Sequence, residues 1–101
     1  MTMMIFLFKI QLMNKNTIHE INNLNAAVTI FSKELKETLT IKAVKGKRGW
    51  NTLPAKQLCE GLRELMQVYN NPDLKPEEAK DLLVHIAAFS MFVHKAISEG
   101  R

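Results

Sequence analysis

The chain has 101 residues, a length that leaves room for one domain. Hydrophobic residues make up 47% of it and charged residues 24%, a balance that excludes an intrinsically disordered chain. The net charge of +4 is mildly basic and does not by itself indicate a nucleic-acid-binding protein. Because Cys59 is the only cysteine, no internal disulfide can form, and we expect a reducing, cytoplasmic location.

Residues 1–13 form an apolar segment whose structure the sequence does not determine. The segment is shorter than the roughly 20 residues that a membrane-spanning helix needs. Lys9 interrupts it and no small-residue cleavage site follows, so we expect neither a signal peptide nor a membrane partner. It is a strand, an additional packing segment, or an extension upstream of a start at Met13. We expect residues 14–101 to form a single helical domain.

Residues 17–43 carry apolar side chains at alternating steps of three and four, which is the pattern of one face of a helix. Asn16 or Thr17 can cap the start of this helix, and Glu20 can complete a capping box from Thr17. Its end is ambiguous, because residues 38–41 favour extended structure as much as helix. The members of the apolar stripe are Ile18, Ile21, Leu24, Val28, Phe31, Leu35 and Leu39.

A basic loop, residues 45–52, follows this helix. Its two glycines break the helix, and Asn51 or Thr52 can cap the next one. We expect a second helix over residues 53–69, with Pro54 in its first turn, where the missing N–H costs nothing. Its predicted core face consists of Leu58, Leu62, Leu65 and Tyr69.

A third helix is predicted over residues 76–99. From Leu82 to Val93, the only residues that are not apolar are His85 and Ser90. A helix that is apolar nearly all round must be covered on more than one side, and two short helices can cover only part of it. We therefore expect an all-α fold, an antiparallel bundle of three main helices, completed by association into a dimer or a larger homo-oligomer.

Two groups of polar side chains on the last two helices indicate a metal site. Facing acid clusters on antiparallel helices hold divalent cations in helical bundles, and Mg²⁺ prefers such oxygen ligands. The alternative is structural: the first group lies opposite the apolar stripe of its helix, as a solvated face does, and His85 donates to the carboxylate of Asp81. The two groups are Glu60, Glu64 and Gln67 on the second helix, and Glu78, Asp81 and His85 on the third.

Three stretches of this sequence together resemble the all-α nucleotide pyrophosphohydrolases, and most closely the small MazG-like proteins of phages and prophages. They are Lys45-Gly-Lys-Arg-Gly-Trp50, Glu78-Ala-Lys-Asp81 and Ala-Ala-Phe-Ser-Met-Phe92. The similarity covers roughly residues 27–97. It implies an oligomeric enzyme in which a Glu-x-x-Glu pair and a Glu-x-x-Asp pair hold Mg²⁺, and which cleaves nucleoside triphosphates to monophosphates and pyrophosphate.

This chain departs from the acid set of the family. By position, the resemblance makes Glu64, Glu78 and Asp81 the metal ligands, while the second acid falls on the neutral Gln67. Glu60 or His85 is a possible substitute for the lost acid. The resemblance therefore implies a Mg²⁺-dependent hydrolase site that is incomplete, weak or silent in catalysis, and that can retain nucleotide binding.

The basic loop, with Lys42 just before it, is rich in cations, and its candidate phosphate-binding residues are Lys45, Lys47, Arg48 and Trp50. A glycine-rich backbone with Lys and Arg can bind the phosphates of a nucleotide while Trp50 stacks on the base. The same composition can follow a nucleic-acid backbone. In a third interpretation the loop is solvated, and Trp50 folds back to cover the end of the bundle. The alternative function is thus a small helical oligomeric adaptor or a nucleic-acid-associated protein.

Overall fold

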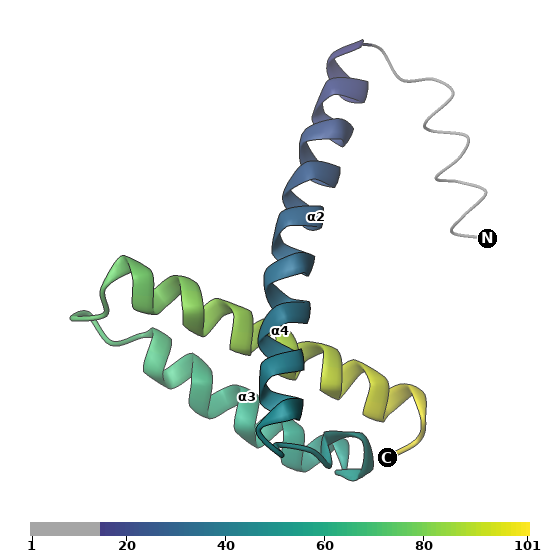
Figure 1. The fold of residues 1–101 in the computed structure, drawn as a ribbon, viewed down its shortest axis with the longest axis vertical. Helices are drawn as coiled ribbons and strands as arrows, with labels where there is room; N and C mark the ends of the chain where they lie inside the picture. The colour runs from purple at the N-terminus through teal and green to yellow at the C-terminus, as the bar shows by residue number, and fades with distance from the viewer. Residues whose placement is uncertain (1–14) are drawn as a thin grey trace. The chain divides into compact units, whose positions relative to one another are not determined.

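The computed structural model describes residues 15–101, so the predictions for the apolar segment 1–13 lie outside the described residues. Within them the protein is all-α, as predicted, with three α-helices, one short 3-10 helix and no strand (Figure 1). The elements are α2 (Lys15–Val44), η1 (Trp50–Thr52), α3 (Ala55–Tyr69) and α4 (Pro76–Ser98). The chain divides into two compact units, Met1–Ser32 and Lys33–Arg101.

The first half of α2 belongs to the first unit, and no residue of α2 is buried. The chain is already helical at Lys15, so Asn16 and Thr17 lie inside the helix. The prediction that one of them caps the start is therefore wrong. A residue inside a helix has helical backbone angles, whereas a capping residue does not.

The C-terminal end of α2 is set by a glycine. Gly46 has a φ of +86°, which only glycine adopts without strain. The N–H of Lys47 donates to the carbonyl of Lys42 at 3.0 Å, and that of Gly46 to the carbonyl of Ala43 at 3.0 Å, the two hydrogen bonds of a Schellman motif. Residues 38–41, which were ambiguous from the sequence, are helical.

The turn between α2 and α3 differs from the prediction. Pro54 has extended backbone angles and is itself the N-cap of α3, so the helix begins at Ala55. The hydroxyl of Thr52 donates to the carbonyl of Gly49 at 2.9 Å and closes the η1 turn. Neither Asn51 nor Thr52 therefore caps α3, because both are used in the preceding 3-10 turn.

Helices α3 and α4 form an antiparallel hairpin around a small core (Figure 1). Leu58 is the one buried residue of α3, with Leu62 and Leu65 half-buried. Tyr69, predicted for the core face, is 41% exposed because it ends α3 beside the turn to α4. The buried residues of α4 recur every fourth position and form its core face; they are Val84, Ala88, Phe92 and Ala96.

Residues 33–44 of α2 belong to the same unit as the hairpin and complete its core. Leu35 and Leu39 pack against the cluster that Leu58 forms with α4. Trp50 also packs there, and its ring stacks on Phe92 with centroids 4.4 Å apart and planes 16° apart. The prediction that Trp50 folds back onto the bundle is confirmed.

Arg101 ties the turn between α2 and α3 to the end of α4. Its Nη1 donates to the carbonyls of Trp50 at 3.1 Å and Leu53 at 3.0 Å. Its own carbonyl accepts from the N–H of Ala55 at 3.1 Å, which satisfies one of the open donors at the start of α3. The arginine thus fixes the backbone around Trp50.

Glu99 lies beside two cations at the same end of α4. Its carboxylate is 2.9 Å from Lys95 Nζ and 3.5 Å from Arg101 Nε. The hydrogen bond from Lys95, with the two positive charges, holds the pKa of Glu99 below its ordinary value. Because this pKa is lower in the folded protein, the ionised Glu99 stabilises the fold at pH values above its unfolded-state pKa. This stabilisation is lost as the pH falls through the folded-state pKa. Because the carboxylate is exposed, this contribution is small.

Helix α4 leaves part of its apolar surface uncovered within the described unit. Leu83 is 42% and Met91 41% exposed. By length and composition α4 could cross a membrane, a test that the core helix of a soluble protein also passes. The expectation that a second copy covers this helix stays a prediction.

Candidate functional site

A pocket of about 550 Å³ lies within the unit Lys33–Arg101. The end of α2, the basic loop and the middle of α4 line it. We call it the basic pocket; its lining residues are Leu39, Lys42, Ala43, Lys47, Arg48, Gly49, Trp50, Asn51, His85, Ala88, Phe89 and Phe92. Its volume falls in the range of about 300–1,000 Å³ typical of small-molecule sites.

The floor of the basic pocket is apolar and aromatic. Leu39 comes from α2, and Phe89 and Phe92 come from α4. The rings of Phe89 and Phe92 are 5.6 Å apart and tilted by 59°, and Trp50 stacks on Phe92 from the loop. Such a floor can hold a flat, apolar or aromatic group.

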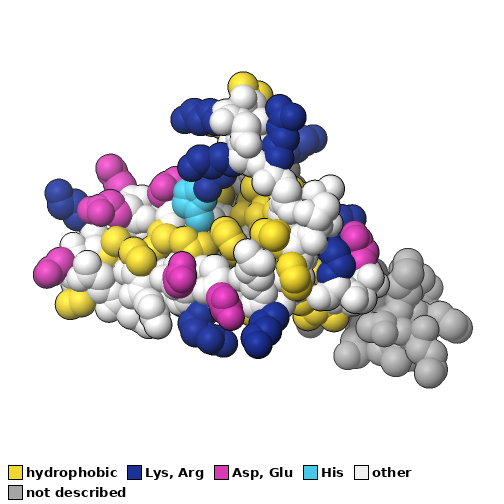
Figure 2. Space-filling view, turned by 90° about the horizontal axis from the view of Figure 1, so that it is seen from below, with side chains coloured by type: hydrophobic (Ala, Val, Ile, Leu, Met, Phe, Trp, Pro, Cys, Tyr) yellow, Lys and Arg dark blue, Asp and Glu magenta, His cyan; other side chains and the backbone are white. Residues whose placement is uncertain are grey.

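The rim of the basic pocket is cationic. Lys42, Lys47 and Arg48 line it, and no carboxylate does among the described residues. Figure 2 shows this face, with Lys and Arg side chains beside a band of hydrophobic side chains and a histidine next to them. Arg48 Nε is 3.5 Å from the carbonyl of Ala43, which holds the guanidinium near the end of α2. Three cations with no carboxylate among the lining residues attract an anion.

Three of the four phosphate-binding residues predicted from the loop line the basic pocket: Lys47, Arg48 and Trp50. Lys45 does not line it and is exposed. Lys42, in the last turn of α2, lines the basic pocket as well.

His85 connects the basic pocket to the neighbouring acids. Its Nε2 lies 3.5 Å from Asp81 Oδ2, one helical turn earlier on α4, so the predicted proximity of the two side chains is confirmed. The histidine side chain is 22% exposed and lines the basic pocket, whereas Asp81 is 73% exposed. The imidazole therefore lies between the basic pocket and an exposed carboxylate.

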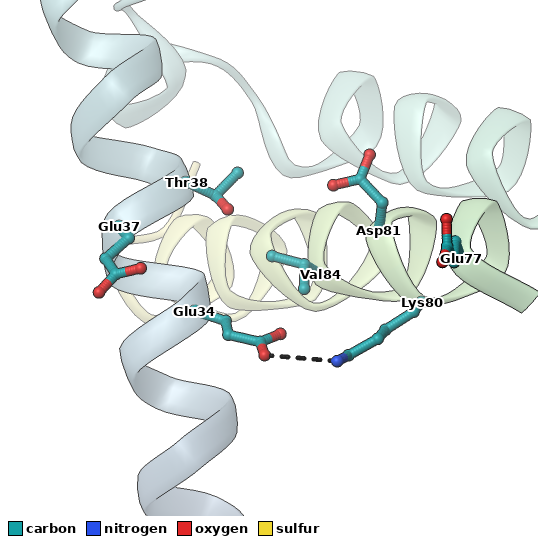
Figure 3. Close-up of a pocket in the computed structure, with 7 residues that line it drawn as sticks. All are labelled: Glu34, Glu37, Thr38, Glu77, Lys80, Asp81 and Val84. Carbon is teal, nitrogen blue, oxygen red and sulfur yellow. Dashed lines mark ion pairs between the residues drawn. The ribbon is translucent and has the colours of Figure 1, made fainter.

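A second, smaller pocket of about 300 Å³ collects carboxylates from α2 and α4 (Figure 3). Glu34 and Glu37 come from α2, and Glu77 and Asp81 come from α4. Lys80 Nζ is 3.7 Å from Glu34 Oε1, an exposed ion pair of small energetic value. We call this the acidic pocket; Thr38 and Val84 complete its lining.

The acids predicted as metal ligands are not gathered in one place. Asp81 lines the acidic pocket, but Glu78 and Glu64 do not. Within residues 15–101, no group of three or more His, Cys, Asp or Glu side chains is arranged to hold a metal ion. The donor set of one described chain therefore does not fit a resident Mg²⁺. Along α3 the side chains of Glu60, Glu64 and Gln67 are all exposed.

The sequence reasoning missed the carboxylates that do lie near Asp81. They are Glu34 and Glu37, three residues apart on the first helix. Residues three apart lie on the same side of a helix, so the sequence could have indicated that these two carboxylates are neighbours. The sequence does not show, however, that this part of α2 lies beside the start of α4.

No family model, curated protein or solved structure was found to match this chain. The geometry of the basic pocket carries the functional argument.

Proposed function

We propose that this protein is a cytoplasmic MazG-like helical protein, dimeric or larger, that binds a nucleotide in the basic pocket and whose pyrophosphohydrolase site is incomplete. One observation carries the proposal: Lys42, Lys47 and Arg48 surround an aromatic floor in a space of about 550 Å³. Cations beside a flat apolar surface match the two ends of a nucleotide, its phosphates and its base.

The phosphates account for the three cations. Arg binds phosphate through two parallel N–H donors, and Lys binds it as a point charge. With no lining carboxylate among the described residues, the rim offers three positive charges to a diphosphate or triphosphate. A single phosphate uses only part of that charge, so we expect triphosphates to bind more tightly than monophosphates.

The base accounts for the aromatic floor. Phe89 is the aromatic lining residue that a base can reach, because Phe92 is 7% exposed and stacks on Trp50. Base–aromatic contact is worth about 1–3 kcal/mol per base and tolerates any base, because every base has a π-face. We therefore expect weak discrimination among bases and strong discrimination by phosphate number.

Binding without hydrolysis follows from the acids. Phosphoanhydride cleavage needs cations that neutralise the phosphate charge and activate a water molecule. Glu64, Glu78 and Asp81 do not form a metal-holding group in the described chain, and Gln67 contributes no charge. The arrangement supports a nucleotide-binding role for the pocket.

Calorimetric titration with ATP, dATP and AMP tests the proposal. We expect the variants Lys47→Ala and Arg48→Ala each to weaken ATP binding about tenfold, or about 1.4 kcal/mol, because each removes one charged phosphate contact. Lys45→Ala is the matched control, since Lys45 carries the same charge in the same loop but does not line the basic pocket. Its affinity should stay within about twofold of wild type.

Two results would contradict this proposal. ATP affinity that falls equally in all three variants would mean that only the general charge of the loop matters. A single-stranded oligonucleotide that binds much more tightly than ATP, with a steep loss of affinity in salt, would favour the nucleic-acid-associated alternative. Absence of binding to either ligand would leave the adaptor as the better account.

We predict that the protein releases no pyrophosphate from nucleoside triphosphates with Mg²⁺ or Mn²⁺. Gln67→Glu restores the acid that the family carries, yet it should stay inactive, because residue 67 is exposed on α3 and joins no metal-holding group in the described chain. A coupled pyrophosphate assay over a nucleotide panel measures this. Wild-type turnover that disappears in Glu64→Gln or Asp81→Asn would overturn the prediction.

A further inference from the structure

Gly61 lies inside α3, where glycine is less favourable than alanine. The other three glycines of the chain, Gly46, Gly49 and Gly100, have a positive φ, which explains why glycine occupies those positions. Gly61 has no positive φ, so its backbone conformation does not require glycine. The reason for a glycine at this position therefore lies in the space that its missing Cβ leaves free.

The ring of Phe89 occupies that space. A Cβ added at Gly61 would lie 2.5 Å from Cε1 of Phe89, 3.1 Å from its Cδ1 and 3.2 Å from its Cζ. The three atoms nearest to the added carbon thus all belong to one ring. One edge of the Phe89 ring lies directly against the backbone of α3, and Gly61 is what allows this close approach.

The same ring lines the basic pocket, whereas Gly61 does not. Phe89 is half-buried and lies 5.6 Å from the buried ring of Phe92, tilted by 59°. Its position is therefore limited by α3 on one side, while another part of the ring faces the space proposed for the base. The closer the ring lies to α3, the deeper the floor of the basic pocket.

We propose that Gly61 sets the depth of the basic pocket by letting the Phe89 ring lie against α3, and thereby determines how well the pocket holds the base of a nucleotide. This inference rests on the proposed nucleotide-binding function. Gly61 is a positioning residue, because it acts through Phe89 and lines no part of the basic pocket. With alanine at position 61 the ring has to move away from α3, and the space open to it is the pocket that it lines.

The phosphate end of the ligand does not depend on Gly61. Lys42 lies in the last turn of α2, and Lys47 and Arg48 lie in the loop that follows, so none of these three cations comes from α3 or α4. A raised floor should therefore weaken the contact with the base and leave the phosphate contacts unchanged. Inorganic tripolyphosphate carries the phosphates without a base, so it measures the phosphate contacts by themselves.

Calorimetric titration of the full-length protein with ATP and with tripolyphosphate tests the inference. We expect Gly61→Ala to weaken ATP binding at least about fivefold, the lower end of what one base–aromatic contact contributes. Its affinity for tripolyphosphate should stay within about twofold of wild type. Gln57→Ala is the matched control, because it places alanine at an exposed position of the same helix that lines neither pocket, and both of its affinities should be unchanged.

A second pair of variants tests whether the effect acts through Phe89. Leucine lacks the Cε1 atom that would lie closest to the added carbon, so in a Phe89→Leu background Gly61→Ala should change ATP affinity less than about twofold. An equal loss of ATP affinity in both backgrounds would overturn the inference.

The remaining outcomes separate this inference from the proposed function. A wild type that binds neither ligand would contradict the proposed function, and this inference with it. A wild type that binds ATP, with an affinity that Gly61→Ala leaves unchanged, would overturn the inference alone. Equal losses for ATP and tripolyphosphate in Gly61→Ala would also overturn it, since Gly61 would then serve only the packing of α3 against α4.

Discussion

Phe92→Ala is expected to lower the free energy of unfolding by about 3–5 kcal/mol, the cost of truncating a buried phenylalanine. Phe92 is only 7% exposed, stacks on Trp50 and contacts Phe89, so its removal leaves a cavity at the centre of the core. The whole core of this unit contains few buried side chains, and a small domain has about 5–15 kcal/mol in total. We expect the variant to be largely unfolded at 37 °C.

Urea denaturation followed by circular dichroism measures this cost. Met91→Ala is the matched control, because it truncates the neighbouring residue of α4, which is 41% exposed. We expect the control to lose about 1 kcal/mol or less. Equal losses in the two variants would mean that the packing of Trp50 against Phe92 does not hold the core together.

Gly61→Val is expected to separate α3 from α4. A Cβ added at Gly61 would lie 2.5 Å from Cε1 of Phe89 and 3.1 Å from its Cδ1, closer than carbon atoms approach. Relieving the clash requires the ring to turn toward the basic pocket that it lines, which disrupts its contact with Phe92. Overpacking of this kind costs about 1–3 kcal/mol, more than valine gains over glycine in helix propensity. For a chain of this size, that lowers the Tm by roughly 10 °C.

Thermal unfolding of Gly61→Val beside Arg63→Val checks this prediction. Arg63 is exposed on the same helix, so the control carries the same new side chain without a clash. Its Tm should stay within a few degrees of wild type. A Gly61→Val variant as stable as the control would show that the hairpin tolerates a wider separation.

Much of the fold was predictable because glycine and proline mark the ends of the helices. Gly46 ends α2, Pro76 begins α4 and Gly100 has the positive φ that terminates it. The spacing of apolar side chains likewise indicated that Leu58 is a core residue. These features are local: each follows from the preferences of one residue or from the period of one helix.

The candidate site was only partly predictable, because it depends on which helices meet. Lys42, Lys47 and Arg48 could be grouped from the sequence because they lie close together along the chain, but His85 joins them only where α4 packs beside the end of α2. The same packing brings Glu34 and Glu37 close to Asp81, whereas sequence position had suggested Glu64 and Glu78. Thr52 was misassigned as a cap because a hydroxyl has several backbone partners within reach, and sequence does not choose among them.

The central claim, a nucleotide in the basic pocket, is tested most directly through Trp50. It is the only tryptophan of the chain and lines the pocket, so its fluorescence reports on changes at that site and in its stack on Phe92. As ATP is added, the tryptophan emission should change and then reach a plateau, both in wild type and in Lys45→Ala. In the variant in which Lys42, Lys47 and Arg48 are all replaced by alanine, the change should be lost. Emission that does not respond to ATP in wild type, or that responds equally in the triple variant, would contradict the account.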